Sequence, residues 1–84
     1  MTIHEQIRQE MTTITRLRAE LAAREAELQE ALNVRDRTME SARSLAHARL
    51  GVSSARRLLS AHETSLEIIK RRAEEIEKTR NRSA

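Results

Sequence analysis

The second half of the sequence carries an apolar seam whose members alternate by steps of four and three residues. Such a heptad pattern holds one face of a helix toward a partner helix over many turns. One member of the seam, His62, is polar. A single polar residue in an otherwise apolar seam helps to fix the register between two helices. The pattern therefore predicts a long helix packed against another helix through Val52, Ala55, Leu59, His62, Leu66, Ile69, Ala73 and Ile76.

The only glycine of the chain, Gly51, directly precedes this seam, and the chain has no proline. A glycine takes the left-handed conformation that ends many helices, and the serines after it are residues that cap a following helix. Thr2 and Glu5 form a capping-box pattern that predicts the start of the first helix. We therefore expect one domain over residues 1–84, with a first helix over about 2–50, a turn at Gly51, a second helix over about 52–80 and a frayed tail at 81–84.

Two other places carry signals of a helix boundary. Asn33 and Asp36 are poor helix formers, and a break there would divide the first helix into two. Thr64 and Glu67 form a second capping-box pattern inside the second helix, but the heptad passes through it without a slip. One continuous helix on each side of Gly51 is the preferred interpretation.

An antiparallel hairpin folded at Gly51 leaves the beginning of the first helix without a partner in its own chain. We therefore expect an all-α helical hairpin or coiled coil that completes a helical bundle by dimerisation. The oligomer interface is predicted at Ile3, Ile7, Met11, Ile14, Leu17 and Leu21. The hairpin seam is predicted at Leu28, Leu32, Met39, Ala42, Leu45, Leu59, His62, Leu66, Ile69, Ala73 and Ile76.

The composition argues against catalysis and cofactor binding. The chain has no cysteine, and none of its 3 histidines has a second histidine at the three- or four-residue spacing of a metal site. A seam between two helices offers no walled pocket in which an acid or base is tuned. No apolar run reaches the roughly 18 residues of a membrane span, and residues 1–10 lack the pattern of a signal peptide. We expect a soluble, cytoplasmic, non-catalytic chain without metal, cofactor, membrane or small-molecule substrate.

Basic residues are concentrated in the second half of the sequence. Residues 1–42 carry 6 Arg or Lys against 8 Asp or Glu, net −2, whereas residues 43–84 carry 10 against 5, net +5. A basic helix can bind nucleic acid through phosphates, although the chain has no aromatic side chain to stack on bases. The nucleic-acid contacts of this hypothesis are Arg56, Arg57, Lys70, Arg71 and Arg72.

The segment around Gly51 also resembles the turn of bacterial helix-turn-helix regulators. It departs from that pattern at Arg57, where such motifs keep an apolar residue, and at His47, where they keep a small one. The resemblance implies a transcriptional regulator that binds DNA.

The preferred function is that of a small helical interaction protein: an adaptor, assembly factor or stoichiometric inhibitor of another macromolecule. Its partners are expected to be a second copy of itself and another protein. The size and the arginine-rich composition are typical of a bacterial or phage accessory protein. The alternative is a dimeric DNA- or RNA-binding protein that uses the basic second helix.

Overall fold

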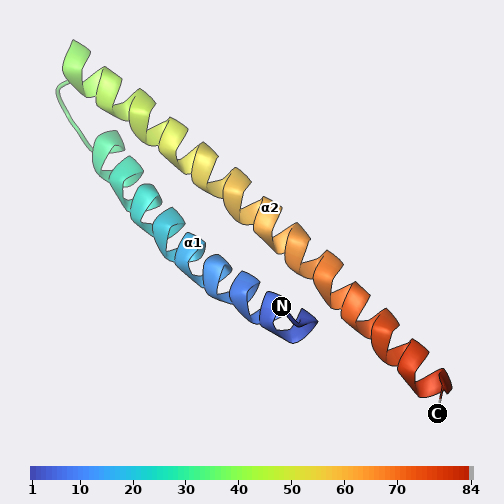
Figure 1. Cartoon of the computed structure of the whole chain (residues 1–84). Helices are drawn as coiled ribbons and strands as arrows, with labels where there is room; N and C mark the ends of the chain where they lie inside the picture. Colours follow the sequence, from blue (N-terminus) through green and yellow to red (C-terminus); the bar gives the residue numbers. More distant parts are fainter. Residues whose placement is uncertain (84) are drawn as a thin grey trace.

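The chain folds into two antiparallel helices, α1 (Ile3–Leu32) and α2 (Met39–Ser83), joined by residues 33–38 (Figure 1). The computed structural model describes residues 1–83, and Ala84, the end of the predicted frayed tail, lies outside the described residues. The predicted all-α helical hairpin is confirmed. The predicted tail is wrong for residues 81–83, which continue α2.

The molecule is a rod rather than a globule. It extends over 70 × 18 × 14 Å, and its radius of gyration is 19.6 Å. A compact chain of this length has a radius of gyration of about 12 Å. Because α2 has 45 residues and α1 has 30, the C-terminal turns of α2 run past the N-terminus of α1 (Figure 1). Two helices packed along one seam therefore leave most of their surface in solvent.

The predicted turn at Gly51 is wrong. Gly51 lies inside α2, and no residue of the described chain has a positive φ. The chain reverses direction at residues 33–38, the place that the sequence marked as the weakest part of the first helix. The resemblance of the segment around Gly51 to a helix-turn-helix turn is not realised either, since α2 runs through it without a break.

Capping residues on both sides of residues 33–38 fix the turn. Asn33 is the C-cap of α1, and its backbone N–H donates to the carbonyl oxygens of Gln29 and Glu30. At the start of α2, the Oγ1 atom of Thr38 accepts from the backbone N–H of Ser41 at 3.1 Å, while the Oγ atom of Ser41 accepts from the backbone N–H of Thr38 at 2.8 Å. This reciprocal pair is a capping box with serine in the place of the usual Glu or Gln. It satisfies two backbone donors that a helix start leaves unpaired.

The predicted start of the first helix is confirmed in its essential contact. Thr2 is the N-cap of α1, and its Oγ1 atom accepts from the backbone N–H of Glu5 at 3.2 Å. The carboxylate of Glu5 lies in the first turn, where it interacts favourably with the positive end of the helix dipole.

The side chain of Arg24 lies beside Gly51 in the interior of α2. A Cβ atom placed on Gly51 would lie 3.4 Å from Cδ of Arg24, so the aliphatic part of the arginine lies directly over the glycine. Arg24 is a seam position of α1, and its side chain passes Gly51 to reach Glu27 with its guanidinium group, 3.3 Å from the carboxylate. A Cβ atom would make an ordinary contact there, and the glycine does not bend the chain.

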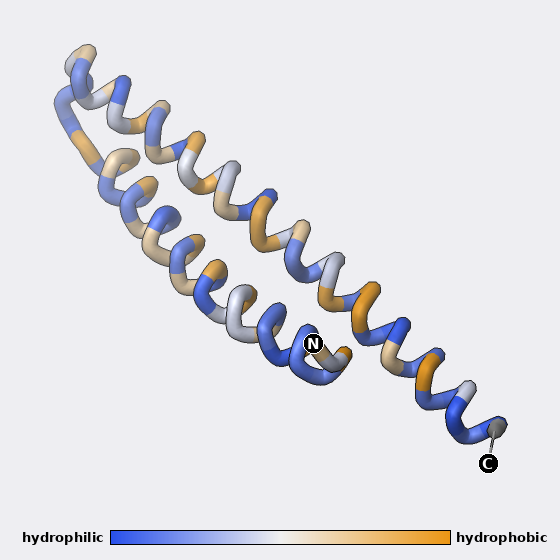
Figure 2. The backbone as a smooth tube through the Cα atoms, in the orientation of Figure 1, coloured by the Kyte–Doolittle hydropathy of each residue, from blue (hydrophilic) through white to orange (hydrophobic). Residues whose placement is uncertain are grey.

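Both helices carry a seam with alternating steps of four and three residues, and Figure 2 shows hydrophobic and hydrophilic stretches alternating along each of them. The seam of α1 consists of Ile3, Ile7, Glu10, Ile14, Leu17, Leu21, Arg24, Leu28 and Ala31. The seam of α2 consists of Ser41, Leu45, Ala48, Val52, Ala55, Leu59, His62, Leu66, Ile69 and Ala73. Ile3 and Ala73 line one hollow at one end of the rod, and Ala31 lines another with Ser44 at the other end, so α1 covers α2 over residues 44–73.

Candidate interaction surfaces

The best-packed part of the molecule lies at the middle of the hairpin. Ile14, Leu17 and Leu59 form a buried cluster with exposures of 4, 2 and 9%, and Leu21 and Leu66 pack against it. These contacts join the two helices of one chain. The cluster therefore supplies the core of the hairpin itself.

The predicted oligomer interface is wrong as a consequence. Five of its six residues lie on the seam that α2 covers, and the two central ones are buried there. The sixth, Met11, lies outside this seam and is 52% exposed. The prediction failed because a turn at Gly51 left this stretch without a partner, whereas the turn at residues 33–38 brings α2 alongside it. The residues concerned are Ile3, Ile7, Met11, Ile14, Leu17 and Leu21.

Seven of the eleven residues predicted for the hairpin seam are buried or half-buried. Leu28, Leu45, Leu59, His62, Leu66, Ile69 and Ala73 are buried or half-buried at seam positions. Four other members are exposed: Leu32, Met39, Ala42 and Ile76. Leu32 and Met39 flank the turn, and Ile76 lies near the end of α1, where it lines a hollow with Thr2 and Ile3.

Sequence reasoning missed the small and polar members of the seam close to the turn. Ala31, Ser41 and Ala48 continue the two heptads toward residues 33–38, and Ala48 is buried. The signal was present in the spacing, because Ser41, Leu45 and Ala48 extend the series of Val52 backward past Gly51 without a slip. Alanine and serine are weak hydrophobic markers, so the predicted seam followed the larger Leu32 and Met39, and then Ala42, through the turn instead.

A polar pair interrupts the apolar seam. Nδ1 of His62 lies 2.9 Å from Oε2 of Glu10, and the two side chains are 32 and 23% exposed. An ionised carboxylate has only acceptor sites, so Nδ1–H of the imidazole donates this hydrogen bond. His62 thus occupies the predicted seam position, and its partner is a carboxylate on the other helix.

The five basic residues of the nucleic-acid hypothesis are exposed on α2, but they do not share one face. Arg56 and Lys70 lie in one row along the helix, with Glu63 midway between them. Arg57 and Arg71 lie in a second row, and Arg72 lies in a third. Rows of an α-helix differ in direction by about 100° per residue. The positive charge is therefore distributed around the helix, with a carboxylate inside one of the rows.

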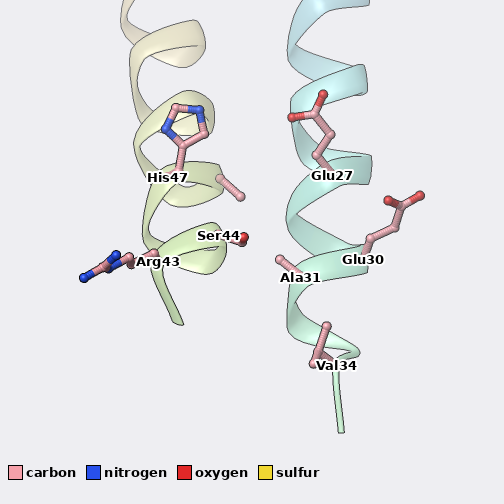
Figure 3. A pocket seen from close by; sticks show the side chains of 8 residues that line it. Glu27, Glu30, Ala31, Val34, Arg43, Ser44 and His47 are labelled. Atoms are coloured by element: carbon pink, nitrogen blue, oxygen red, sulfur yellow. The ribbon is translucent and has the colours of Figure 1, made fainter. Parts of the chain in front are cut away.

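An open hollow near the turn is lined by residues of both helices (Figure 3). Ala31 and Ser44 point toward one another across it, whereas Glu30 and Arg43 point away. Glu27 and His47 also line the hollow. Within residues 1–83, no group of three His, Asp or Glu side chains is placed to hold a metal ion.

Within the described residues, neither α1 nor α2 contains a stretch that is both long enough and apolar enough to cross a bilayer. No protein-family model matches this chain, and no curated protein and no solved structure is significantly similar to it.

Proposed function

We propose that this chain is a non-catalytic helical interaction protein that acts by stoichiometric binding, as an adaptor, an assembly factor or an inhibitor of another macromolecule. The observation that carries the proposal is the large surface left in solvent. The chain exposes 6875 Å². A compact monomer of 9.7 kDa exposes about 5,100 Å², so the excess is roughly 1,750 Å².

The uncovered surface contains large apolar side chains. Leu50, Leu58 and Ile68 on α2 are 67, 48 and 53% exposed, and Met11 on α1 is 52% exposed. Among residues 1–82, only five side chains are buried. A stable protein interface buries about 800 Å² on each partner. The excess surface of this rod is larger than that area, so a partner that covered it would still leave as much surface exposed as a compact monomer has. Binding of a partner would supply the burial that the two-helix seam lacks.

The proposal also holds that the protein performs no chemistry. Apart from Glu10 and His62, which meet in the seam, the titratable residues among 1–82 are exposed, and the hollow near the turn is open to solvent. Tuning an acid or base for catalysis requires a partly desolvated site. The interaction role is therefore preferred over an enzymatic one.

Affinity capture from a bacterial lysate, with and without nuclease, tests the proposal. We expect a protein partner that survives nuclease treatment, and the complex should re-form from the two purified proteins at a fixed molar ratio. Replacing the exposed Leu50 by Glu, compared with Ser53 by Glu, tests whether the partner contacts the apolar surface. A partner that disappears with nuclease would contradict a protein-binding role.

Nucleic-acid binding is the second candidate, because none of Arg56, Arg57, Lys70, Arg71 and Arg72 forms an ion pair within the described residues. Phosphate contacts of this kind weaken steeply as salt rises. We expect no sequence-dependent binding of labelled duplex at about 0.15 M salt. Submicromolar binding that is lost on replacing Arg71 and Arg72 by Ala would make this candidate the correct one.

A further inference from the structure

The exposed surface of α2 contains a second face with heptad spacing, next to the seam that packs against α1. We call it the uncharged face. Its steps again alternate between three and four residues. The face begins at Gly51, which is half-buried beside Arg24, and continues through the exposed Ser54, Leu58, Ala61, Ser65 and Ile68. Within the same span, every other exposed row of α2 carries a charge, at Arg56, Arg57, Glu63 or Glu67. Heptad spacing without charge indicates a surface that packs against a helix.

We propose that the uncharged face binds the same face of a second copy of this chain, so that two hairpins associate through antiparallel α2 helices. This inference rests on the proposed interaction role and names one partner. A two-fold axis between residues 59 and 60 would place Leu58 beside the partner's Ala61, Ser54 beside the partner's Ser65, and Gly51 beside the partner's Ile68. Leu58 then meets the small Ala61, and Ile68 meets Gly51 together with the aliphatic part of Arg24 that lies over the glycine.

The position of this two-fold axis agrees with the fold. The uncharged face extends from residue 51 to residue 68, so its middle lies between residues 59 and 60. The part of α2 that α1 covers extends over residues 44–73, and its middle lies between residues 58 and 59, one residue from the middle of the uncharged face. The α1 helices of both copies would therefore lie over the same section of the dimer. A face that is symmetric about a point near the middle of the hairpin is the property that a closed two-fold interface demands.

The direction of the uncharged face fits a bundle of four helices. Ala61 and His62 are neighbours in sequence, and one belongs to the uncharged face and the other to the seam with α1. The two faces therefore point about 100° apart, close to the right angle between neighbours at a corner of a four-helix bundle. Each α2 can contact its own α1 and the partner's α2 at the same time.

The ends of the face are complementary in charge. Continuing the same antiparallel register, Arg72 falls beside the partner's His47, and Glu75 falls beside the partner's Ser44. Glu27 lines the hollow that His47 and Ser44 share with α1, and Arg43 lines it as well (Figure 3). In this register Arg72 comes near Glu27, which already pairs with Arg24 at 3.3 Å, and Glu75 comes near Arg43, whose side chain points away from the hollow. Opposite charges at the rim favour this register over shifted ones.

The exposed area is sufficient for such a dimer. Each copy exposes 6875 Å², roughly 1,750 Å² more than a compact chain of 9.7 kDa, whereas a standard interface needs about 800 Å² per partner. A second copy fits this face better than an unrelated helix because large, small and charged residues all match under one symmetry operation.

The first test compares two neighbouring positions of the full chain. Ala61→Glu introduces a charge in the uncharged face, whereas Ser60→Glu introduces the same charge on an exposed row outside it. Sedimentation equilibrium across the micromolar range should give twice the chain mass for the parent and for Ser60→Glu, and the single-chain mass for Ala61→Glu. Circular dichroism should show equal helicity for all three. A monomeric parent, or equal behaviour of the two variants, overturns the proposal.

The second test fixes the antiparallel register by disulfide trapping, since the chain has no cysteine of its own. Ser54→Cys and Ser65→Cys variants, mixed and mildly oxidised, should form the mixed disulfide. Each variant alone should remain largely uncrosslinked, because its two copies would be eleven residues apart along the helix, about 16 Å, and a disulfide spans less than about 7 Å between Cα atoms. Disulfides formed by each variant alone would overturn the antiparallel arrangement. Capture of another macromolecule by a monomeric parent would leave the interaction role standing and remove this dimer.

Discussion

His62 and Glu10 face each other across the seam of the hairpin, with Nδ1 of the imidazole 2.9 Å from Oε2 of the carboxylate. The positions beside them on the seam are apolar: Ile7 and Ile14 flank Glu10, and Leu59 and Leu66 flank His62. A polar pair in this setting contributes less to stability than a pair of apolar side chains would. It opposes shifted registers, because a shift would leave both groups among aliphatic side chains.

The double substitution Glu10→Leu with His62→Leu is therefore expected to raise the free energy of unfolding by about 1 kcal/mol, which urea denaturation measures. Glu10→Leu alone and His62→Leu alone should gain less, since each leaves one polar group without its partner. The two single variants and the double variant form a double-mutant cycle. A double variant less stable than the parent would show that the pair is a net source of stability.

Gly51→Ala is expected to stabilise the protein by about 0.5–1 kcal/mol, because alanine is a better residue than glycine inside a helix. The added Cβ would lie 3.4 Å from Cδ of Arg24, an ordinary contact with a flexible side chain. Ala46→Gly, at an exposed position of the same helix, should lose about as much. The unfolding temperature of both variants is measured in chains that also carry Ala61→Glu. This substitution is expected to keep the chain monomeric, so self-association does not affect the comparison. A loss of stability in Gly51→Ala would point to a turn at this residue.

Thr38→Ala is expected to cost about 1 kcal/mol of stability, because it removes the acceptor of the Ser41 backbone N–H at the start of α2. Thr38→Ser keeps the hydroxyl group and should retain most of the stability. Urea denaturation of the two variants separates the hydrogen bond from the loss of side-chain volume. Equal destabilisation by serine and alanine would show that the capping contact does not matter.

Leu17→Ala is expected to cost about 2–4 kcal/mol, because Leu17 is 2% exposed and its truncation leaves a cavity between the helices. Met11→Ala, on the same helix but 52% exposed, should change stability by less than about 0.5 kcal/mol. The unfolding midpoint of each variant is measured by circular dichroism at several protein concentrations. A cost of Leu17→Ala that vanishes on dilution would place this residue in an intermolecular contact.

The sequence by itself determined the helical class, the hairpin and much of the seam. The strict heptad from Val52 onward identified the inner face of α2, and Thr2 identified the start of α1, because spacing and capping act through neighbours in the chain. The position of the turn was decided by tertiary structure. A turn at Gly51 and a turn at residues 33–38 are both acceptable locally, but only the second covers the seam of α1 along its whole length with the seam of α2.

The position of the turn also decided which seam residues are buried inside the hairpin and which residues cover them. Ile14 and Leu17 were recognised as seam residues from their spacing, yet only the folded hairpin shows that Leu59 of the same chain covers them. Gly51 has no local feature that distinguishes a turn residue from one in the interior of a helix, because the position of the turn depends on how α1 and α2 pair. The spacing of apolar residues predicts which side of a helix is buried. Which helix covers that side depends on the pairing of α1 and α2 that buries the greatest length of both seams.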